Sequence, residues 1–260
     1  MVEAVTLAAQ ETGAGPPVVI LHGLFGSKRN WQSVARKLAG EFRVFSVDLR
    51  NHGDSPHRPD MNYASMAADI GLFLEQSNIR DAALIGHSMG GKAAMTYALH
   101  APVAIRRLVI VDIAPRAYRN EYGEMLRAMN ALDLATLKRR RDADEALATV
   151  IPAHEVRMFI LQNLRFGDGA PKWRINLPAI SDAIDDIVGA IPITRDARFE
   201  RPMHVIRGEH SDRVGQADLA MLAPLFPRLG LSTITSAGHW PHSENPTEFL
   251  GELTTILSAP

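Results

Sequence analysis

The stretch that decides the fold is Ala82-Ala83-Leu84-Ile85-Gly86-His87-Ser88-Met89-Gly90-Gly91. Its first residues form a short apolar run, typical of a buried strand, and a helical pattern continues from it to residue 100. Between the two lies G-x-S-x-G, the pattern of a sharp turn from strand to helix. Positions two residues either side of the serine press against backbone at such a turn, so glycine is needed there. The pattern therefore predicts an accessible Ser88 at a helix N-terminus, which stabilises developing negative charge.

Similar apolar runs recur along the whole chain. They cover residues 18–22, 43–48, 82–86, 107–112, 203–207 and 231–235. Helical patterns lie between most of them, at 31–39, 63–76, 89–100 and 219–225, and a last one covers 247–257. Strands that are apolar almost throughout are covered on both faces, and their alternation with helices is typical of a mostly parallel, doubly wound sheet. We therefore expect the α/β class.

The alternation stops between residues 115 and 201. Four helical segments follow one another there without a strand, at 121–132, 144–150, 155–164 and 179–188. We expect a core made of residues 1–114 and 201–260, and a helical cap inserted as residues 115–200. A basic run at positions 138–141 of this cap is followed at once by acidic residues, so we interpret it as a solvated helix face.

Composition excludes several classes of function. With 260 residues, 46% of them hydrophobic, the chain is long enough for one large core with an insertion. The net charge of −1 does not supply the basic surface that binds nucleic acid, and the absence of cysteine excludes disulfides and thiolate chemistry. No apolar run has the roughly 18 to 20 residues of a membrane span, and Glu3 stands where a signal peptide is basic. We expect a cytoplasmic protein that uses neither a metal nor an organic cofactor.

A serine hydroxyl is a weak nucleophile unless a base removes its proton. Of the ten histidines, His239 is best placed, because it follows the last predicted strand, where the base lies in chains that use this turn. We interpret His22 and His87, which flank glycines, as structural residues near the expected cleft, and we place His242 near its rim.

Two aspartates are candidates for the group that orients the imidazole. The usual position in G-x-x-D-x-x-V, counted from Gly208, is occupied by Ser211, and Asp212 is one residue off. Asp112 ends the strand that follows the nucleophile's helix, at the edge of the sheet where catalytic groups gather. We favour Asp112 and keep Asp212 as the alternative.

The loop after residues 18–22 is the expected oxyanion hole. Its sequence His22-Gly23-Leu24-Phe25-Gly26 allows backbone to approach a substrate oxygen, and we expect the amides of Leu24 and Met89 to be the donors. The polar loop at residues 48–55 resembles a functional cluster, but its Asp, Asn and Gly are what a tight turn needs, so we assign it to structure.

Taken together, HGLFGS (22–27), VDLRNHGDSPH (47–57), GHSMGGKAAM (86–95), VDIAP (111–115) and AGHWPH (237–242) resemble the YbfF-type bacterial esterases, a group that includes a mitochondrial abhydrolase relative. The resemblance covers core and cap and implies the α/β-hydrolase fold, for which we expect an eight-stranded, mostly parallel sheet. It implies Asp112 as the acid with Ser211 at the usual aspartate position, although Asp212 departs from the family pattern. It also implies that Trp173 walls the acyl pocket with Phe25 and Trp240, a plain packing role being the alternative for Trp173.

The sequence thus predicts an enzyme that hydrolyses a small-molecule carboxylic ester or acyl thioester through an acyl-enzyme on Ser88. Serine at this position, rather than aspartate, argues against dehalogenase and epoxide hydrolase chemistry. Hydrolysis of carbon–carbon bonds and perhydrolysis stay open, as does a binding protein that senses a small ligand without turnover. Acyl-chain length and oligomeric state are not readable from the sequence.

Overall fold

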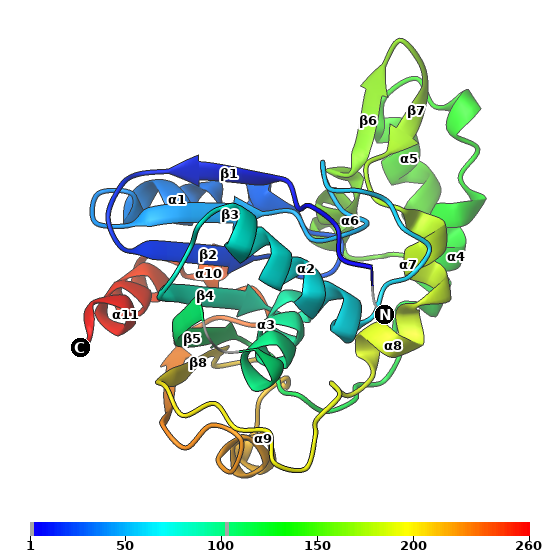
Figure 1. The fold of residues 1–260 in the computed structure, drawn as a ribbon. Helices are drawn as coiled ribbons and strands as arrows, with labels where there is room; N and C mark the ends of the chain where they lie inside the picture. The colour runs from blue at the N-terminus through cyan, green and yellow to red at the C-terminus, as the bar shows by residue number, and fades with distance from the viewer. Residues whose placement is uncertain (1–2, 102–103) are drawn as a thin grey trace.

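The computed structural model describes residues 3–101 and 104–260 (Figure 1). Its main sheet has the strand order β1-β3-β2-β4-β5-β8-β9. The strands are β1 (Ala9–Thr12), β2 (Pro17–Leu21), β3 (Arg43–Val47), β4 (Ala82–His87), β5 (Ile105–Val111), β8 (Met203–Gly208) and β9 (Leu229–Ile234). All neighbours pair in parallel except β1, which pairs antiparallel with β3 at the edge. The predicted mostly parallel sheet is confirmed.

Helices cover both faces of this sheet, because successive side chains of a strand point to opposite sides. On β4, Leu84 packs in a cluster with α2, α3 and α9, whereas Ile85 packs in a second cluster with α1 and α11. The core helices are η1 (Lys28–Trp31), α1 (Gln32–Leu38), α2 (Tyr63–Gln76), α3 (Met89–His100), α9 (Gln216–Leu222), α10 (Pro241–Glu244) and α11 (Pro246–Ser258). The alternation read from the sequence therefore produces a layer of helices on each face.

The expected eight strands are wrong for the described residues, where the main sheet has seven. Each of the six apolar runs overlaps a strand. The seventh strand, β1, was missed because its sequence AQET is polar and largely exposed. Before it, Val5 and Leu7 are buried without strand pairing. The Val5 amide donates instead to the carboxylate of Asp69 (2.7 Å). The chain ahead of β1 is thus anchored to a helix, and no further strand is added there.

Between β5 and β8 the chain forms an insertion, and we propose residues 115–200 as its cap. Its elements are α4 (Gly123–Ala131), η3 (Leu134–Thr136), α5 (Arg140–Leu147), α6 (His154–Leu161), β6 (Leu164–Gly167), β7 (Gly169–Trp173), α7 (Leu177–Asp182) and α8 (Ile184–Val188). None of the helices in the part of the chain that the structure describes is both long and apolar enough to cross a membrane.

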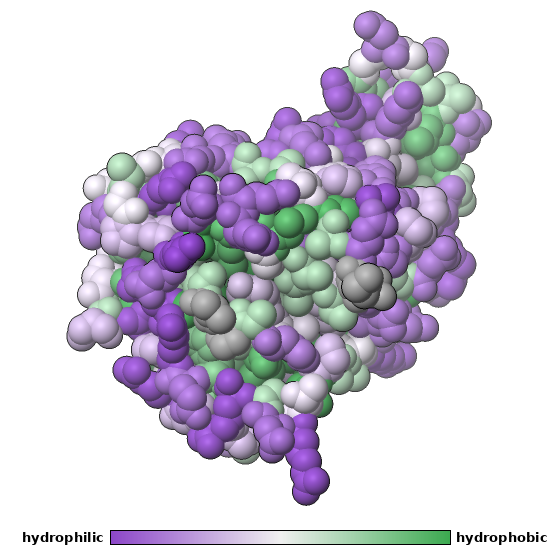
Figure 2. Space-filling model, in the orientation of Figure 1, coloured by the Kyte–Doolittle hydropathy of each residue, from purple (hydrophilic) through white to green (hydrophobic). Residues whose placement is uncertain are grey.

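The expectation of a purely helical insertion is wrong. Strands β6 and β7 form an antiparallel hairpin in which Leu164 pairs with Trp173. The hairpin projects from the body (Figure 1), and its tip is hydrophilic (Figure 2). Each strand has one buried residue, so the pair has no apolar run that periodicity could detect. The hairpin also explains why α6 stops at Leu161, short of the predicted helix end at residue 164.

Candidate active site

Ser88 lies on the sharp turn between β4 and α3. Its backbone has φ +52° and ψ −121°, a conformation that non-glycine residues rarely adopt. A Cβ at Gly86 would lie 2.3 Å from the Gly90 carbonyl oxygen, and one at Gly90 would lie 2.5 Å from the His22 carbonyl oxygen. Both glycines are therefore required by close backbone contact, as the motif predicts. The Ser88 amide donates to Val111 O on the next strand (3.1 Å), which holds the turn against the sheet.

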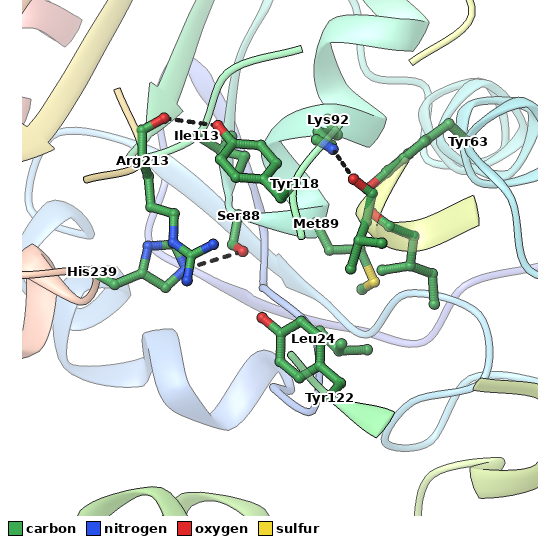
Figure 3. Close-up of a pocket in the computed structure, with 12 residues that line it drawn as sticks. Leu24, Tyr63, Ser88, Met89, Lys92, Ile113, Tyr118, Tyr122, Arg213 and His239 are labelled. Carbon is green, nitrogen blue, oxygen red and sulfur yellow. Dashed lines mark hydrogen bonds between the residues drawn. The ribbon is translucent and has the colours of Figure 1, made fainter. Parts of the chain in front are cut away.

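Three side chains from distant parts of the chain meet at this turn. His239 Nε2 lies 3.1 Å from Ser88 Oγ (Figure 3), and its Nδ1 lies 2.7 Å from Asp112 Oδ2. Asp112 is fully buried at the end of β5. Because the carboxylate can only accept, Nδ1 carries the proton and Nε2 is free to accept the serine proton.

Ser211 and the main chain complete the surroundings of Asp112. Ser211 Oγ donates to Asp112 Oδ2 (2.5 Å), and the Gly208 amide donates to Oδ1 (3.2 Å). Asp212, the alternative acid, has a side chain that is 93% exposed and lies 3.5 Å from Arg213 Nε. The structure therefore brings Asp112 to the imidazole, places Ser211 against Asp112 and leaves Asp212 in solvent. One position along the loop separates a half-buried hydroxyl from an exposed carboxylate.

The loop after β2 presents a main-chain amide next to Ser88. Gly23 O accepts hydrogen bonds from the Gly26 amide (2.9 Å) and from His22 Nδ1 (2.8 Å). The C=O and N–H of a planar trans peptide point in opposite directions. Because these hydrogen bonds fix the direction of the Gly23 carbonyl, they also fix the Leu24 N–H of the same peptide, which points the opposite way. Met89 is the first residue of α3, so its N–H has no partner within the helix. Leu24, Met89 and Ser88 line one pocket, which fits two donors for an oxyanion.

Buried histidines support the site without charge. Burial is the main cause that lowers the pKa of His22 and of His87, and it lowers the pKa of His242 to about 3. His87 Nε2 donates to the His239 carbonyl (2.8 Å), as expected for a structural residue. His242 is buried against Trp31, with stacked rings 4.3 Å apart, and lines the outer cavity.

Two cavities open at Ser88. The inner one has about 30 Å³ and is partly polar, with Lys92 and tyrosines in its wall (Figure 3). The outer one has about 370 Å³ and includes Phe25 and Trp240, two of the expected pocket residues. The cap adds Met125, Val156, Phe159 and Ile160 to it. Trp173 instead lies in the hairpin, half-buried against the core cluster, and is in neither wall among the described residues.

Lys92 is a residue that the sequence analysis missed. It lies one helical turn after Ser88, and its buried ammonium donates to the carbonyl oxygens of Gly189 (2.5 Å) and Val188 (3.2 Å), where the cap returns to the core. Burial lowers its pKa to about 7. The available signal was a lysine inside the apolar helix that follows G-x-S-x-G. Among the described residues, no group of three or more His, Asp or Glu side chains is placed to hold a metal ion.

The fold and the site together place the chain in a family. A family model described as the alpha/beta hydrolase fold matches residues 16–246, and the chain belongs to this family. The esterase YbfF of Escherichia coli is 36% identical over 251 residues, which are 96% of this chain and 96% of that protein. The sn-1-specific diacylglycerol lipase ABHD11 of Danio rerio is 38% identical over 94% of this chain and 79% of its own length. A solved marine microorganism esterase superposes with a TM-score of 0.93 at 35% identity, covering 97% of this chain and all of that one.

Proposed function

We propose that this protein is a carboxylic ester hydrolase in which Ser88, His239 and Asp112 act as nucleophile, base and orienting acid. The observation that carries the proposal is the pair of contacts from Ser88 Oγ to His239 Nε2 (3.1 Å) and from Nδ1 to Asp112 (2.7 Å), at a strained turn that opens into a cavity. This is the arrangement that acyl transfer through a serine requires.

The reaction has two halves. Ser88 Oγ attacks the ester carbonyl carbon while His239 Nε2 takes the hydroxyl proton, and the Leu24 and Met89 amides stabilise the oxyanion. The tetrahedral intermediate expels the alcohol, which receives the proton from His239, and an acyl-enzyme is left on Ser88. Water then attacks the acyl carbon with His239 as base, and collapse of the second intermediate releases the carboxylic acid and frees Ser88.

The substrate class follows from the cavity and from the relatives. Phe25 and Trp240 give the outer cavity aromatic walls, which favour an apolar acyl or alcohol group beside the ester. The relatives named esterase and lipase support an oxygen ester. Acyl thioesters pass through the same intermediates, so they are the natural second substrate to compare.

The test is turnover of p-nitrophenyl esters from acetate to palmitate, with acyl-CoA thioesters alongside. Ser88→Ala is expected to lower kcat by about a thousandfold or more, because the serine and its base act as a unit. Ser77→Ala, at the end of α2, is the matched control and is expected to keep full turnover. Circular dichroism of both variants checks that the fold is intact. Equal turnover by wild type and a folded Ser88→Ala variant would contradict the proposal.

A further inference from the structure

The backbone of Phe25, directly after the proposed oxyanion donor Leu24, is held at both of its polar groups. Its N–H donates to His52 Nε2 (3.2 Å), and its carbonyl accepts from Asn163 Nδ2 (2.7 Å). His52 comes from the core loop after β3, whereas Asn163 comes from the cap, 138 positions away. The backbone of Phe25 also has φ +59°, a value that non-glycine residues rarely adopt. The loop that carries the oxyanion donor is therefore clamped between core and cap.

The chemistry of both clamping groups is defined by their neighbours. His52 Nδ1 lies 3.0 Å from the Arg50 carbonyl and donates to it, so Nε2 is the acceptor for the Phe25 amide. Burial lowers the pKa of His52 to about 3, so this neutral form persists at any ordinary assay pH. Asn163 Nδ2 faces the carbonyls of both Phe25 (2.7 Å) and Ile160 (3.2 Å), and only the nitrogen of its amide can donate to them.

Asn163 is itself rigidly placed in the cap. It follows the end of α6 and is 4% exposed. The backbone amide of Asn163 donates to Ile160 O (3.0 Å). Its backbone carbonyl accepts from the backbone amide of Arg174, after the hairpin (2.7 Å). The same helix supplies Phe159 and Ile160 to the outer cavity. The end of α6 therefore lines the outer cavity, and the residue two positions after it holds the oxyanion loop.

We propose that Asn163 is a positioning residue for the oxyanion hole, through which the cap sets the rate of turnover as well as the choice of substrate. The inference rests on the proposed ester hydrolysis. An oxyanion donor acts only when it lies about 2.7 to 3.1 Å from the developing negative oxygen, and a small displacement is costly. Without the cap hydrogen bond, the left-handed Phe25 is free to relax, and the Leu24 amide moves with it.

The test is Asn163→Ala in the full-length protein, assayed with p-nitrophenyl butyrate. We expect kcat to fall at least about tenfold while KM changes less than about threefold, because the lost interaction is made in the transition state. Phenylboronic acid adds to an active serine as a tetrahedral adduct with an oxygen in the oxyanion hole. Its inhibition is therefore expected to weaken by about the same factor as kcat.

Asn176→Ala is the matched control. Asn176 also joins cap to core, donating to Asn51 Oδ1 (3.1 Å) and Arg58 O (3.0 Å), but contacts neither the oxyanion loop nor Ser88 in the described structure. We expect this variant to keep wild-type kcat. Asn163→Ser, whose hydroxyl is too short to span to Phe25, gives the same comparison with a smaller change in packing, so a poorly folded Asn163→Ala does not prevent the test.

Two results separate this inference from the proposed function. If both Asn163 variants match Asn176→Ala in kcat, or change KM alone, the positioning role is wrong while ester hydrolysis stands. If the wild-type protein turns over no ester, the proposed function fails and this inference fails with it.

Discussion

Phe25, Ser88 and Asp112 share an unusual backbone conformation, with φ of +59°, +52° and +51°. Such residues cost of order 1 to 3 kcal/mol each and persist only where the surroundings hold them. Here the amide of each one donates a hydrogen bond, to His52, Val111 and Ile206 respectively. Three of the seven described non-glycine residues with positive φ thus belong to the proposed nucleophile, acid and oxyanion loop, which have to be aimed at one point.

The choice of acid is tested at this scale. Asp112→Asn is expected to lower kcat about a thousandfold or more, because a neutral amide neither stabilises the imidazolium nor selects the right tautomer. Asp212→Asn is the matched control, directly after the Ser211 that contacts Asp112. Its kcat is expected to stay within about twofold, as for an exposed side chain whose ion pair among the described residues is with Arg213. The measurement is steady-state turnover of one ester by both variants. The reverse ranking would assign the acid to Asp212.

Helix α3 connects Ser88, the proposed nucleophile, to the proposed cap. Its first turn follows Ser88, and Lys92 in the next turn donates to the chain just after α8. The ammonium also lies 4.8 Å from the ring centre of Tyr118 and 5.5 Å from that of Tyr63. Arg116 and Arg213 add to the effect of burial in lowering the pKa of Lys92. A single helix thus carries both the strained turn and a polar attachment for the end of the insertion.

This attachment predicts a pH dependence of stability. Lys92 has a pKa of about 7 in the folded protein, whereas lysine in an unfolded chain has a pKa of about 10.4. Between these values the unfolded chain holds a proton that the folded chain lacks, so the contribution of Lys92 to stability rises with pH, and below pH 7 its burial cost is present in full. We expect the Tm of Lys92→Met minus that of wild type to be nearly constant below pH 7 and to fall steadily from pH 7 to pH 10. A difference that is independent of pH would contradict the lowered pKa.

A buried ion pair joins three parts of the whole molecule. The guanidinium of Arg50 contacts both carboxylate oxygens of Asp69, at 2.6 and 2.7 Å, and both side chains are fully buried. Arg50 follows β3, and Asp69 lies in α2. In the N-terminal segment, the Glu3 carbonyl accepts from the Arg50 guanidinium and the Val5 amide donates to the Asp69 carboxylate. Removing one partner would leave a charge without its main counterion inside the protein.

Asp69→Asn is therefore expected to lower the free energy of unfolding by about 3 kcal/mol. Glu11→Gln, which breaks the exposed pair with Arg43, is the control and is expected to cost less than about 1 kcal/mol. Urea denaturation followed by circular dichroism measures both values. Similar losses for the two variants would mean that the buried pair contributes no more than a surface contact.

Much of the fold was predictable because its signals are local. Six apolar runs predicted six strands, and the glycines around Ser88 predicted the turn whose backbone contacts require them. What was missed carries little local signal. Strand β1 is polar because it lies at an edge, and the cap hairpin is too short to show a period. Lys92 was missed because a charged residue in an apolar helix has no partner that sequence spacing reveals.

By itself, the sequence determined the strand, turn and helix that present Ser88, the position of His239 after the last strand, and two candidate acids. All of these depend on neighbours a few residues apart. Only the tertiary structure decided that Asp112 lies 2.7 Å from His239 while Asp212 faces solvent, and that Asn163 of the cap holds Phe25. These contacts join residues more than a hundred positions apart, and their geometry is set by packing of the cap and sheet, which no local pattern encodes.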